Sequence, residues 1–144
     1  MQDPARHRDA YAVFQPMQTR WRDNDQFGHM YNATYLELFD EAMNMSLIDR
    51  GFLDHVSGAP IMVVVENGCQ FLREVAYPDR LTIGLRVAHI GRSSTRFEMG
   101  MFRADDDVES ARSHFVMVTV DSATRRPVAI PDDQRAALET MRKP

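Results

Sequence analysis

The sequence has one cysteine, Cys69, and no long hydrophobic run. One cysteine excludes an internal disulfide and fits a reducing cytoplasm, which is where we expect the protein to reside. No apolar stretch approaches the ~20 residues that a membrane-spanning helix needs, and the polar N-terminus lacks the apolar core of a signal peptide. Internal repeats, glycine–serine linkers and low-complexity tracts are also missing. We therefore expect neither a membrane anchor nor a targeting segment.

The composition is that of an ordinary folded domain. The chain has 144 residues, of which 44% are hydrophobic and 26% charged, which excludes disorder along most of its length. We expect a flexible polar segment over residues 1–12 and a single domain over 13–144. The formal net charge of -4 gives no general attraction to nucleic acid or to an anionic membrane, so we expect neither as a partner.

The N-terminal part of this domain predicts a strand followed by a loop. Residues 14–22 alternate, with Met17, Thr19 and Trp21 on one face, as in a half-buried strand. Residues 23–31 (DNDQFGHMY) break the alternation and combine Asp, Asn and Gly, which is typical of a loop.

A helix is predicted over residues 32–50. Asn32 or Thr34 could cap it, with Glu37 completing a capping box with Thr34, and Gly51 would end it. The apolar side chains that cover most of its circumference are Tyr35, Leu36, Leu38, Phe39, Ala42, Met43, Met45, Leu47 and Ile48. A helix that is apolar nearly all round is enclosed by other structure.

Four more strands are predicted, each separated from the next by turn residues. Their ranges are 61–72, 81–90, 94–103 and 113–121, and a short helix follows over 132–142. Strands joined by short turns are antiparallel neighbours. The pattern predicts an α+β fold in which a curved antiparallel sheet of about five strands wraps around one long central helix. Pairing with a second copy would cover the open edges of this sheet.

The loop before the helix carries the most suggestive chemistry. Asp25 and His29 lie in a glycine-containing loop that leads directly into a helix N-terminus. Backbone N–H groups at such an end favour developing negative charge, and a nearby carboxylate can act as general base or nucleophile. Gly28 would allow a tight turn. Loop carboxylates also often cap helices or face solvent, and we expect that structural role for Asp23, paired with Arg20 or Arg22.

The segment RWRDNDQFGHMYNATY, residues 20–35, closely resembles the signature of the 4-hydroxybenzoyl-CoA thioesterase family. It is most similar to the bacterial acyl-CoA thioesterase branch with the pattern D-N-D-x-x-G-H-x-x-N. Segments that resemble later parts of the family follow in the right order, at residues 71–86, 89–94 and 124–128.

The resemblance implies a hot-dog fold and hydrolysis of an acyl-CoA thioester. Asp25 would be the catalytic carboxylate, His29 and Asn32 would support it, and backbone N–H groups near the helix start would polarise the carbonyl. From the resemblance and the residue pattern together, we predict as substrate-binding residues Gly28, Tyr31, Tyr35, Glu66, Arg92, Ser93 and Ser94. No metal or separate cofactor is implied, because CoA is part of the substrate. The implied assembly is a homodimer or homotetramer with sites at the dimer interface.

Several of these residues have ordinary structural alternatives. His29 could be a hydrogen-bonded loop histidine. Glu66, at the end of the run IMVVV, could be a second polar group in the pocket or a strand-end residue facing solvent. Arg92, Ser93 and Ser94 have donors suited to CoA phosphates but could form a solvated turn.

Three other functions remain open at this stage. A hot-dog hydratase or dehydratase would also act on acyl thioesters, although its Asp and His lie in a different local setting. A non-catalytic acyl-thioester binding module would keep the pocket without turnover, because fold alone does not establish chemistry. A metal site built from Asp23, Asp25 and His29 is a remote third alternative.

Overall fold

A computed structural model describes residues 4–52 and 58–143 of the chain. Its five strands form one antiparallel sheet in the order β1-β3-β4-β5-β2. The strands are β1 (Val13–Gln18), β2 (Ile61–Phe71), β3 (Arg80–Ile90), β4 (Ser94–Arg103) and β5 (Ala111–Val120). The helices are α1 (Asn32–Ile48) and α2 (Asp132–Glu139), with two short 3-10 helices, η1 (Arg8–Ala10) and η2 (Trp21–Asp23).

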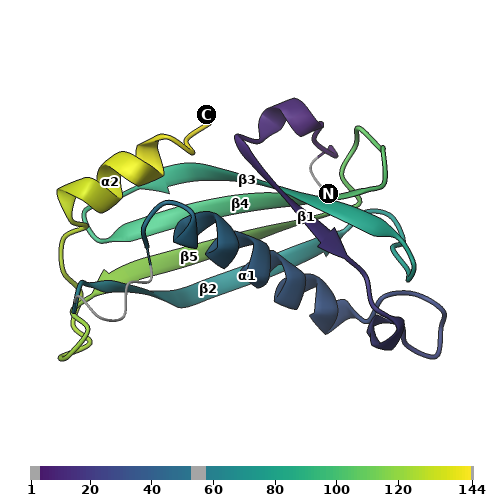
Figure 1. Cartoon of the computed structure of the whole chain (residues 1–144), viewed down its shortest axis with the longest axis horizontal. Helices are drawn as coiled ribbons and strands as arrows, with labels where there is room; N and C mark the ends of the chain where they lie inside the picture. Colours follow the sequence, from purple (N-terminus) through teal and green to yellow (C-terminus); the bar gives the residue numbers. More distant parts are fainter. Residues whose placement is uncertain (1–3, 53–57, 144) are drawn as a thin grey trace.

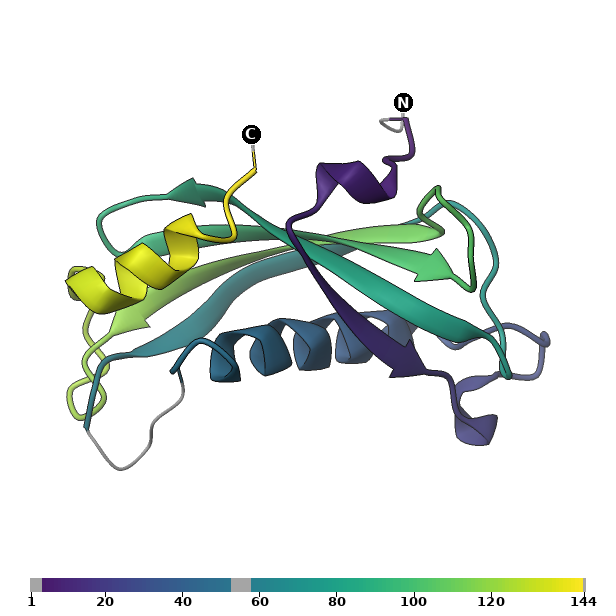
Figure 2. The same ribbon diagram turned by 45° about the horizontal axis from the view of Figure 1, so that its top comes forward.

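The curved sheet lies on α1 as the sequence predicts. Figures 1 and 2 show α1 against one face of the sheet, while η1 lies on the opposite side, which we call the outer face. The predicted α+β class and the hot-dog arrangement are therefore confirmed. With 17 residues, α1 is a helix of moderate length rather than a long one.

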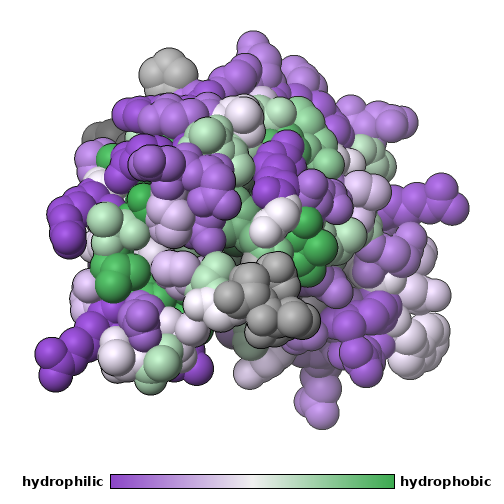
Figure 3. All heavy atoms as spheres, turned by 60° about the vertical axis from the view of Figure 1, so that its left-hand side comes forward, coloured by the Kyte–Doolittle hydropathy of each residue, from purple (hydrophilic) through white to green (hydrophobic). Residues whose placement is uncertain are grey.

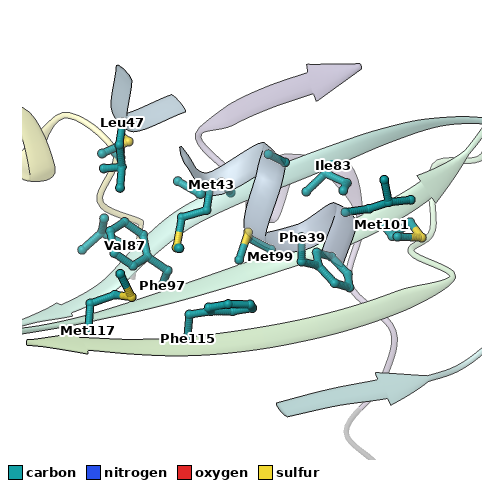
Figure 4. Close-up of a cluster of buried hydrophobic side chains, with 14 of the residues drawn as sticks. Phe39, Met43, Leu47, Ile83, Val87, Phe97, Met99, Met101, Phe115 and Met117 are labelled. Carbon is teal, nitrogen blue, oxygen red and sulfur yellow. The ribbon is translucent and has the colours of Figure 1, made fainter. Parts of the chain in front are cut away.

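Hydrophobic side chains between α1 and the sheet form the core. Phe39 and Met43 of α1 meet Phe97 and Met99 of β4 and Phe115 of β5 (Figure 4). Alternate residues of a strand point to opposite faces, so the core-facing positions leave their polar neighbours on the outer face. Burying one such large side chain stabilises the fold by roughly 1.5–3 kcal/mol.

The start of α1 differs from the prediction. Neither Asn32 nor Thr34 is the N-cap; Tyr31 is, and it makes no side-chain capping hydrogen bond. The N–H group of Thr34, one of the first in the helix, donates to the Tyr31 carbonyl oxygen at 2.9 Å. A reciprocal side-chain cap occurs instead in η2, between Arg20 and Asp23. The spacing of residues in the sequence did not show that the reciprocal cap belongs to η2 rather than to the start of α1.

Two other predictions need correction. The first strand ends at Gln18 rather than at residue 22, because the chain turns into η2, and Trp21 is 84% exposed there instead of half-buried. In a single chain α1 is not enclosed on all sides either, since Met45 and Ile48 are 40% and 56% exposed. These exposed apolar residues lie on the helix face that the sheet does not cover.

The described residues before β1, from Pro4 onward, are packed against the outer face. Residues 1–12 are predicted to be flexible, yet Tyr11 is buried and its hydroxyl donates to Glu109 Oε2 at 2.5 Å. Gly84 of β3 makes room for this ring, since an added Cβ would lie 2.8 Å from Tyr11 Cγ. The described part of the N-terminal segment therefore forms part of the folded domain.

One edge of the sheet is open. Within the described residues β2 pairs with β5 along one side and has no strand on its other side. A bulge at Val64–Glu66 interrupts this strand, and Val64 and Val65 are 43% and 59% exposed. On the face that Figure 3 shows, hydrophobic side chains surface in small groups among hydrophilic ones. No helix within the described ranges is long and apolar enough to cross a membrane.

Candidate active site

The loop between η2 and α1 closes on itself. The N–H group of Asp25 donates to the His29 carbonyl oxygen at 2.9 Å, and the N–H group of Gly28 donates to the Asp25 carbonyl oxygen at 3.2 Å. Gly28 has φ +83°, a left-handed conformation that glycine adopts without strain. The glycine thus allows a tight turn that returns the chain to the start of α1.

Asp25 is half-buried at the beginning of this turn. Its Oδ1 accepts a hydrogen bond from the N–H group of Phe27 at 2.8 Å. This contact fixes the carboxylate within the loop and leaves its other oxygen, Oδ2, without a protein donor among the interactions of the described residues. Phe27 itself is 84% exposed.

Neighbouring segments hold the loop in place. The N–H group of Met30 donates to the Val75 carbonyl oxygen at 2.7 Å, and the N–H group of Tyr77 donates to Asn24 Oδ1 at 2.9 Å. The N–H group of Tyr31 donates to the Asp23 carbonyl oxygen at 2.7 Å. The residues after β2 and those of η2 therefore fix the loop from two sides.

Asp23 has the structural role that the sequence suggests. It is 2% exposed, and Arg20 Nη2 lies 2.9 Å from its Oδ1. The backbone N–H group of Arg20 also donates to Asp23 Oδ2, at 2.7 Å. The predicted pairing with Arg20 is confirmed, and it is more buried than an ordinary surface ion pair.

A pocket of about 270 Å³ lies beside the N-terminus of α1 and is open to solvent. Its lining residues are His29, Met30, Asn32, Tyr35, Phe71, Leu72, Arg73 and Glu74. The rings of Tyr35 and Phe71 meet edge to face with centroids 4.9 Å apart. Burial raises the pKa of Tyr35, so this hydroxyl is protonated at neutral pH. The pocket combines an apolar wall with a polar rim.

The α1 N-terminus adds positive potential to this place. Tyr31 caps the helix without a side-chain hydrogen bond. The first N–H groups of a helix have no intrahelical acceptor, and together with the helix dipole they attract a negatively charged oxygen. The arrangement can stabilise an oxyanion that forms next to the loop.

The structure brings only some of the predicted site residues together. His29, Asn32 and Tyr35 line the pocket, while Asp25, Gly28 and Tyr31 belong to the adjoining loop and helix start. Tyr31 is 51% exposed.

Glu66 does not join this group. Its partner in register on β5 is Val116, which is adjacent to the core residue Phe115 and so points to the opposite face, and Glu66 therefore lies on the outer face. There Glu66 Oε2 lies 3.0 Å from His114 Nε2. The interpretation of Glu66 as a polar group of the same pocket is not supported within one chain.

The turn of Arg92, Ser93 and Ser94 lies at the opposite end of the sheet. Strand β3 runs for 11 residues from Arg80, next to Gln18, to Ile90 just before this turn. At about 3.3 Å per residue this is a span of roughly 35 Å. The turn also bonds to its neighbours, as the N–H group of Ile130 donates to the Arg92 carbonyl oxygen at 2.9 Å. Within a single chain, these three residues therefore lie far from the pocket.

Glu74 is one of the pocket residues that sequence reasoning missed, with Met30, Phe71, Leu72 and Arg73. Its Oε2 lies 3.1 Å from His29 Nε2. Glu74 lies in the connection between β2 and β3, 45 positions after His29, and nothing in its local sequence distinguishes it from other exposed glutamates. Only the packing of the loop against residues 71–77 brings the two side chains together.

The residues of the loop do not converge as a metal site. Among the described residues, no group of three His, Cys, Asp or Glu side chains has the spacing needed to hold a metal ion. Asp23 is turned toward Arg20, so the alternative site of Asp23, Asp25 and His29 is not formed.

Comparison with known proteins agrees with this fold. A family model described as the thioesterase-like superfamily matches residues 19–138, which include the loop, the pocket and all of the sheet except β1. The chain belongs to the thioesterase-like superfamily. The resemblance to hot-dog thioesterases that the sequence indicates is confirmed, as is the enzyme class, a thioester hydrolase.

Solved structures of similar proteins support the assignment of this thioesterase. The PA5185 protein of Pseudomonas aeruginosa is 43% identical, with a TM-score of 0.92 and coverage of 97% of this chain and 98% of the other. The PA2801 protein of the same organism is 26% identical, with a TM-score of 0.81 and coverage of 89% and 98%. A thioesterase of Thermus thermophilus, crystallised with coenzyme A and zinc, is 25% identical, with a TM-score of 0.76 and coverage of 91% and 94%.

Proposed function

We propose that this thioesterase hydrolyses an acyl-CoA to a free carboxylic acid and CoA, with Asp25 as the catalytic carboxylate. The observation that carries the proposal is the pocket beside the α1 N-terminus, which is bordered by the loop of Asp25 and His29. The coenzyme A bound to the Thermus thermophilus relative is consistent with CoA as the carrier.

The proposed reaction begins with the thioester carbonyl directed at the N-terminal N–H groups of α1. Asp25 takes a proton from water, and the resulting hydroxide attacks the carbonyl carbon. The oxyanion that forms is stabilised by the helix N-terminus. The C–S bond then breaks, and the CoA thiolate leaves and is protonated. Water thus supplies the hydroxyl group added to the acyl carbon and the hydrogen added to the thiolate. In the nucleophilic alternative, Asp25 attacks first, and water hydrolyses the anhydride that results.

His29 and Asn32 have supporting roles in this proposal. Both line the pocket, where the imidazole can orient water or the carbonyl group. The apolar wall of Tyr35 and Phe71 would face the acyl or pantetheine part of the substrate. We propose no metal and no separate cofactor for this reaction.

A homodimer completes the proposed site. The open edge of β2 and its exposed Val64 and Val65 favour antiparallel pairing with the same strand of a second copy. Such a pair reverses the second sheet, so the turn of Arg92 of the partner subunit lies at the same end of the joined sheet as the first pocket. That turn could then bind CoA phosphates, a role that the ~35 Å separation rules out within one chain. The single cysteine fits the cytoplasmic location that is part of this proposal.

The experiment is release of free thiol from short, long and aromatic acyl-CoAs by the wild type and Asp25→Asn. Loss of an essential base or nucleophile should lower kcat at least ~100-fold. Asp105→Asn, an exposed aspartate in the β4–β5 turn, is the control and should retain full activity. Equal activity of wild type and Asp25→Asn would refute the role of Asp25.

Isotope labelling separates the two roles of the carboxylate. A single turnover in ¹⁸O-water places label in Asp25 if the residue attacks directly and water then opens the anhydride at the Asp25 carboxyl carbon, whereas a general base leaves the label in the product acid alone. Mass spectrometry of the peptide that contains Asp25 gives the answer. Sedimentation of the protein tests the dimer independently.

A further inference from the structure

A second pocket, of about 350 Å³, lies on the outer face of the sheet. Its charged and titratable lining residues are Arg6, Cys69, Arg96, Glu98, Arg112 and His114. On β4, Arg96 and Glu98 alternate with the core residues Phe97 and Met99, so their side chains point away from α1. The sheet therefore separates this pocket from the core on its α1 side.

Three arginines share one carboxylate in this pocket and at its edge. Arg86 Nη2 lies 2.7 Å from Glu98 Oε1, Arg96 Nε lies 3.1 Å from Glu98 Oε2, and Arg6 Nη1 lies 3.7 Å from Glu98 Oε1. Burial disfavours the charged form of Glu98, but the hydrogen bonds from Arg86 and Arg96 outweigh it, and its pKa is lowered. The carboxylate is ionised at neutral pH, yet it balances only one of the three positive charges.

A buried network supports one wall of the pocket. Arg112 is 7% exposed and donates from Nε to Glu109 Oε1 at 2.7 Å. Glu109 is fully buried and accepts the hydroxyl of Tyr11. Because these groups are fixed by mutual hydrogen bonds, the wall is rigid before any ligand arrives.

The floor of the pocket depends on a glycine. A Cβ atom at Gly68 would lie 2.7 Å from Cε1 of His114, so the absence of a side chain lets the imidazole lie over β2. His114 also contacts Glu66 at the rim. The pocket is thus shaped by residues from the N-terminal segment and from three strands.

We propose that this outer-face pocket binds the phosphate group of a small phosphorylated ligand. Planar guanidinium groups bind phosphate oxygens with paired, charge-assisted hydrogen bonds. Arg96 is the main candidate, because its side chain is 40% exposed while its partner Glu98 is also held by two other arginines. A volume of about 350 Å³ lies in the range of small-molecule pockets, so it has room for more than one phosphate.

This site is separate from the proposed thioester site. The thioester pocket lies at the α1 N-terminus, while the phosphate pocket lies across the sheet from α1. The proposal therefore holds or fails independently of the role of Asp25.

The test is isothermal titration of the full chain with inorganic phosphate and, separately, with ADP, each matched to sodium chloride of equal ionic strength. The wild type should show saturable binding, and Arg96→Gln should weaken it about tenfold or more, the effect of losing one charge-assisted hydrogen bond. Arg103→Gln is the matched control, because Arg103 lies on the same strand, is 43% exposed and pairs with Asp106 at 3.6 Å. It should leave binding unchanged.

The two ligands distinguish the source of the phosphate. Binding of both supports a site for the phosphate group itself, and binding of ADP alone supports a nucleotide site in the same pocket. The proposal is overturned if neither ligand binds, or if Arg96→Gln and Arg103→Gln have equal effects. It is also overturned if Arg92→Gln abolishes binding while Arg96→Gln retains it, since the ligand would then occupy the distant turn. A change in oligomeric mass of Arg96→Gln with unchanged affinity would assign the cluster to a subunit interface instead.

Discussion

The imidazole Nε2 of His29 lies 3.1 Å from the carboxylate Oε2 of Glu74, and both residues line the pocket at the start of α1. The two side chains come from segments that the chain separates by a helix and a strand. The contact joins the loop of Asp25 to the connection that follows β2. It gives His29 a defined orientation at the wall where the thioester is proposed to bind.

We therefore expect Glu74→Gln to lower kcat by about threefold to tenfold with a smaller effect on KM, because His29 loses the partner that positions it. The exposed fractions of the two side chains, 44% and 74%, mean that the pair adds little to stability. The midpoint of thermal unfolding should stay within a few degrees of the wild type. Steady-state kinetics and a melting curve measure both quantities.

Glu139→Gln is the control for this variant. Glu139, the last residue of α2, is 48% exposed and pairs with Arg142 at 3.4 Å, outside the pocket. If Glu139→Gln and Glu74→Gln had the same kinetics, the positioning role of Glu74 would be wrong.

Substitutions of Asp23 and Asp25 should separate an effect on folding stability from an effect on turnover. Asp23→Asn weakens a buried, charge-assisted contact with Arg20, and we expect it to lower the free energy of unfolding by about 1–3 kcal/mol. Asp25→Asn should change the unfolding free energy much less, since among the described residues its carboxylate accepts a single hydrogen bond, from Phe27. Urea unfolding of both variants beside the wild type gives the comparison. A larger loss of stability in Asp25→Asn would reverse these assignments.

We expect Glu98 to make the free energy of unfolding depend on pH in the acid range. Its pKa is lower in the folded protein than the ordinary value of 4.5, because hydrogen bonds from Arg86 and Arg96 outweigh the effect of burial. The stabilisation is therefore fully present above pH 4.5 and is lost as the pH falls through the folded pKa. The difference in unfolding free energy between wild type and Glu98→Gln should shrink steadily below that pH. Denaturant unfolding between neutral and acid pH measures it, and a difference that grows with acidification would contradict the charge arrangement.

Much of the fold could be predicted from the sequence because its signals are local. The alternation of Leu81, Ile83 and Leu85 predicts β3, and the apolar run beginning at Tyr35 predicts α1. Turn residues between strands indicate antiparallel neighbours. The end of β1 was harder, because the alternating pattern continues past Gln18 into η2, where Trp21 faces solvent.

The candidate site could be predicted in part for the same reason. Asp25, Gly28 and His29 lie within one short loop, so their proximity follows from the chain itself and from the family signature. By contrast, Glu66 and the turn of Arg92 are joined to this loop only through the sheet. Strand alternation puts Glu66 on the outer face, and the length of β3 moves Arg92 to the far end.

By itself the sequence determined the order of the elements, the core-facing residues and the loop that carries Asp25, since each depends on residues close together in the chain. Only the tertiary structure decided that Glu74 meets His29 and that Arg6, Arg86 and Arg96 gather around Glu98. Apart from the pair of Arg96 and Glu98, which lie two positions apart on β4, these contacts join residues far apart in sequence or on different strands. They depend on the register of neighbouring strands and on which segments pack across the sheet, and a local pattern of residues contains neither.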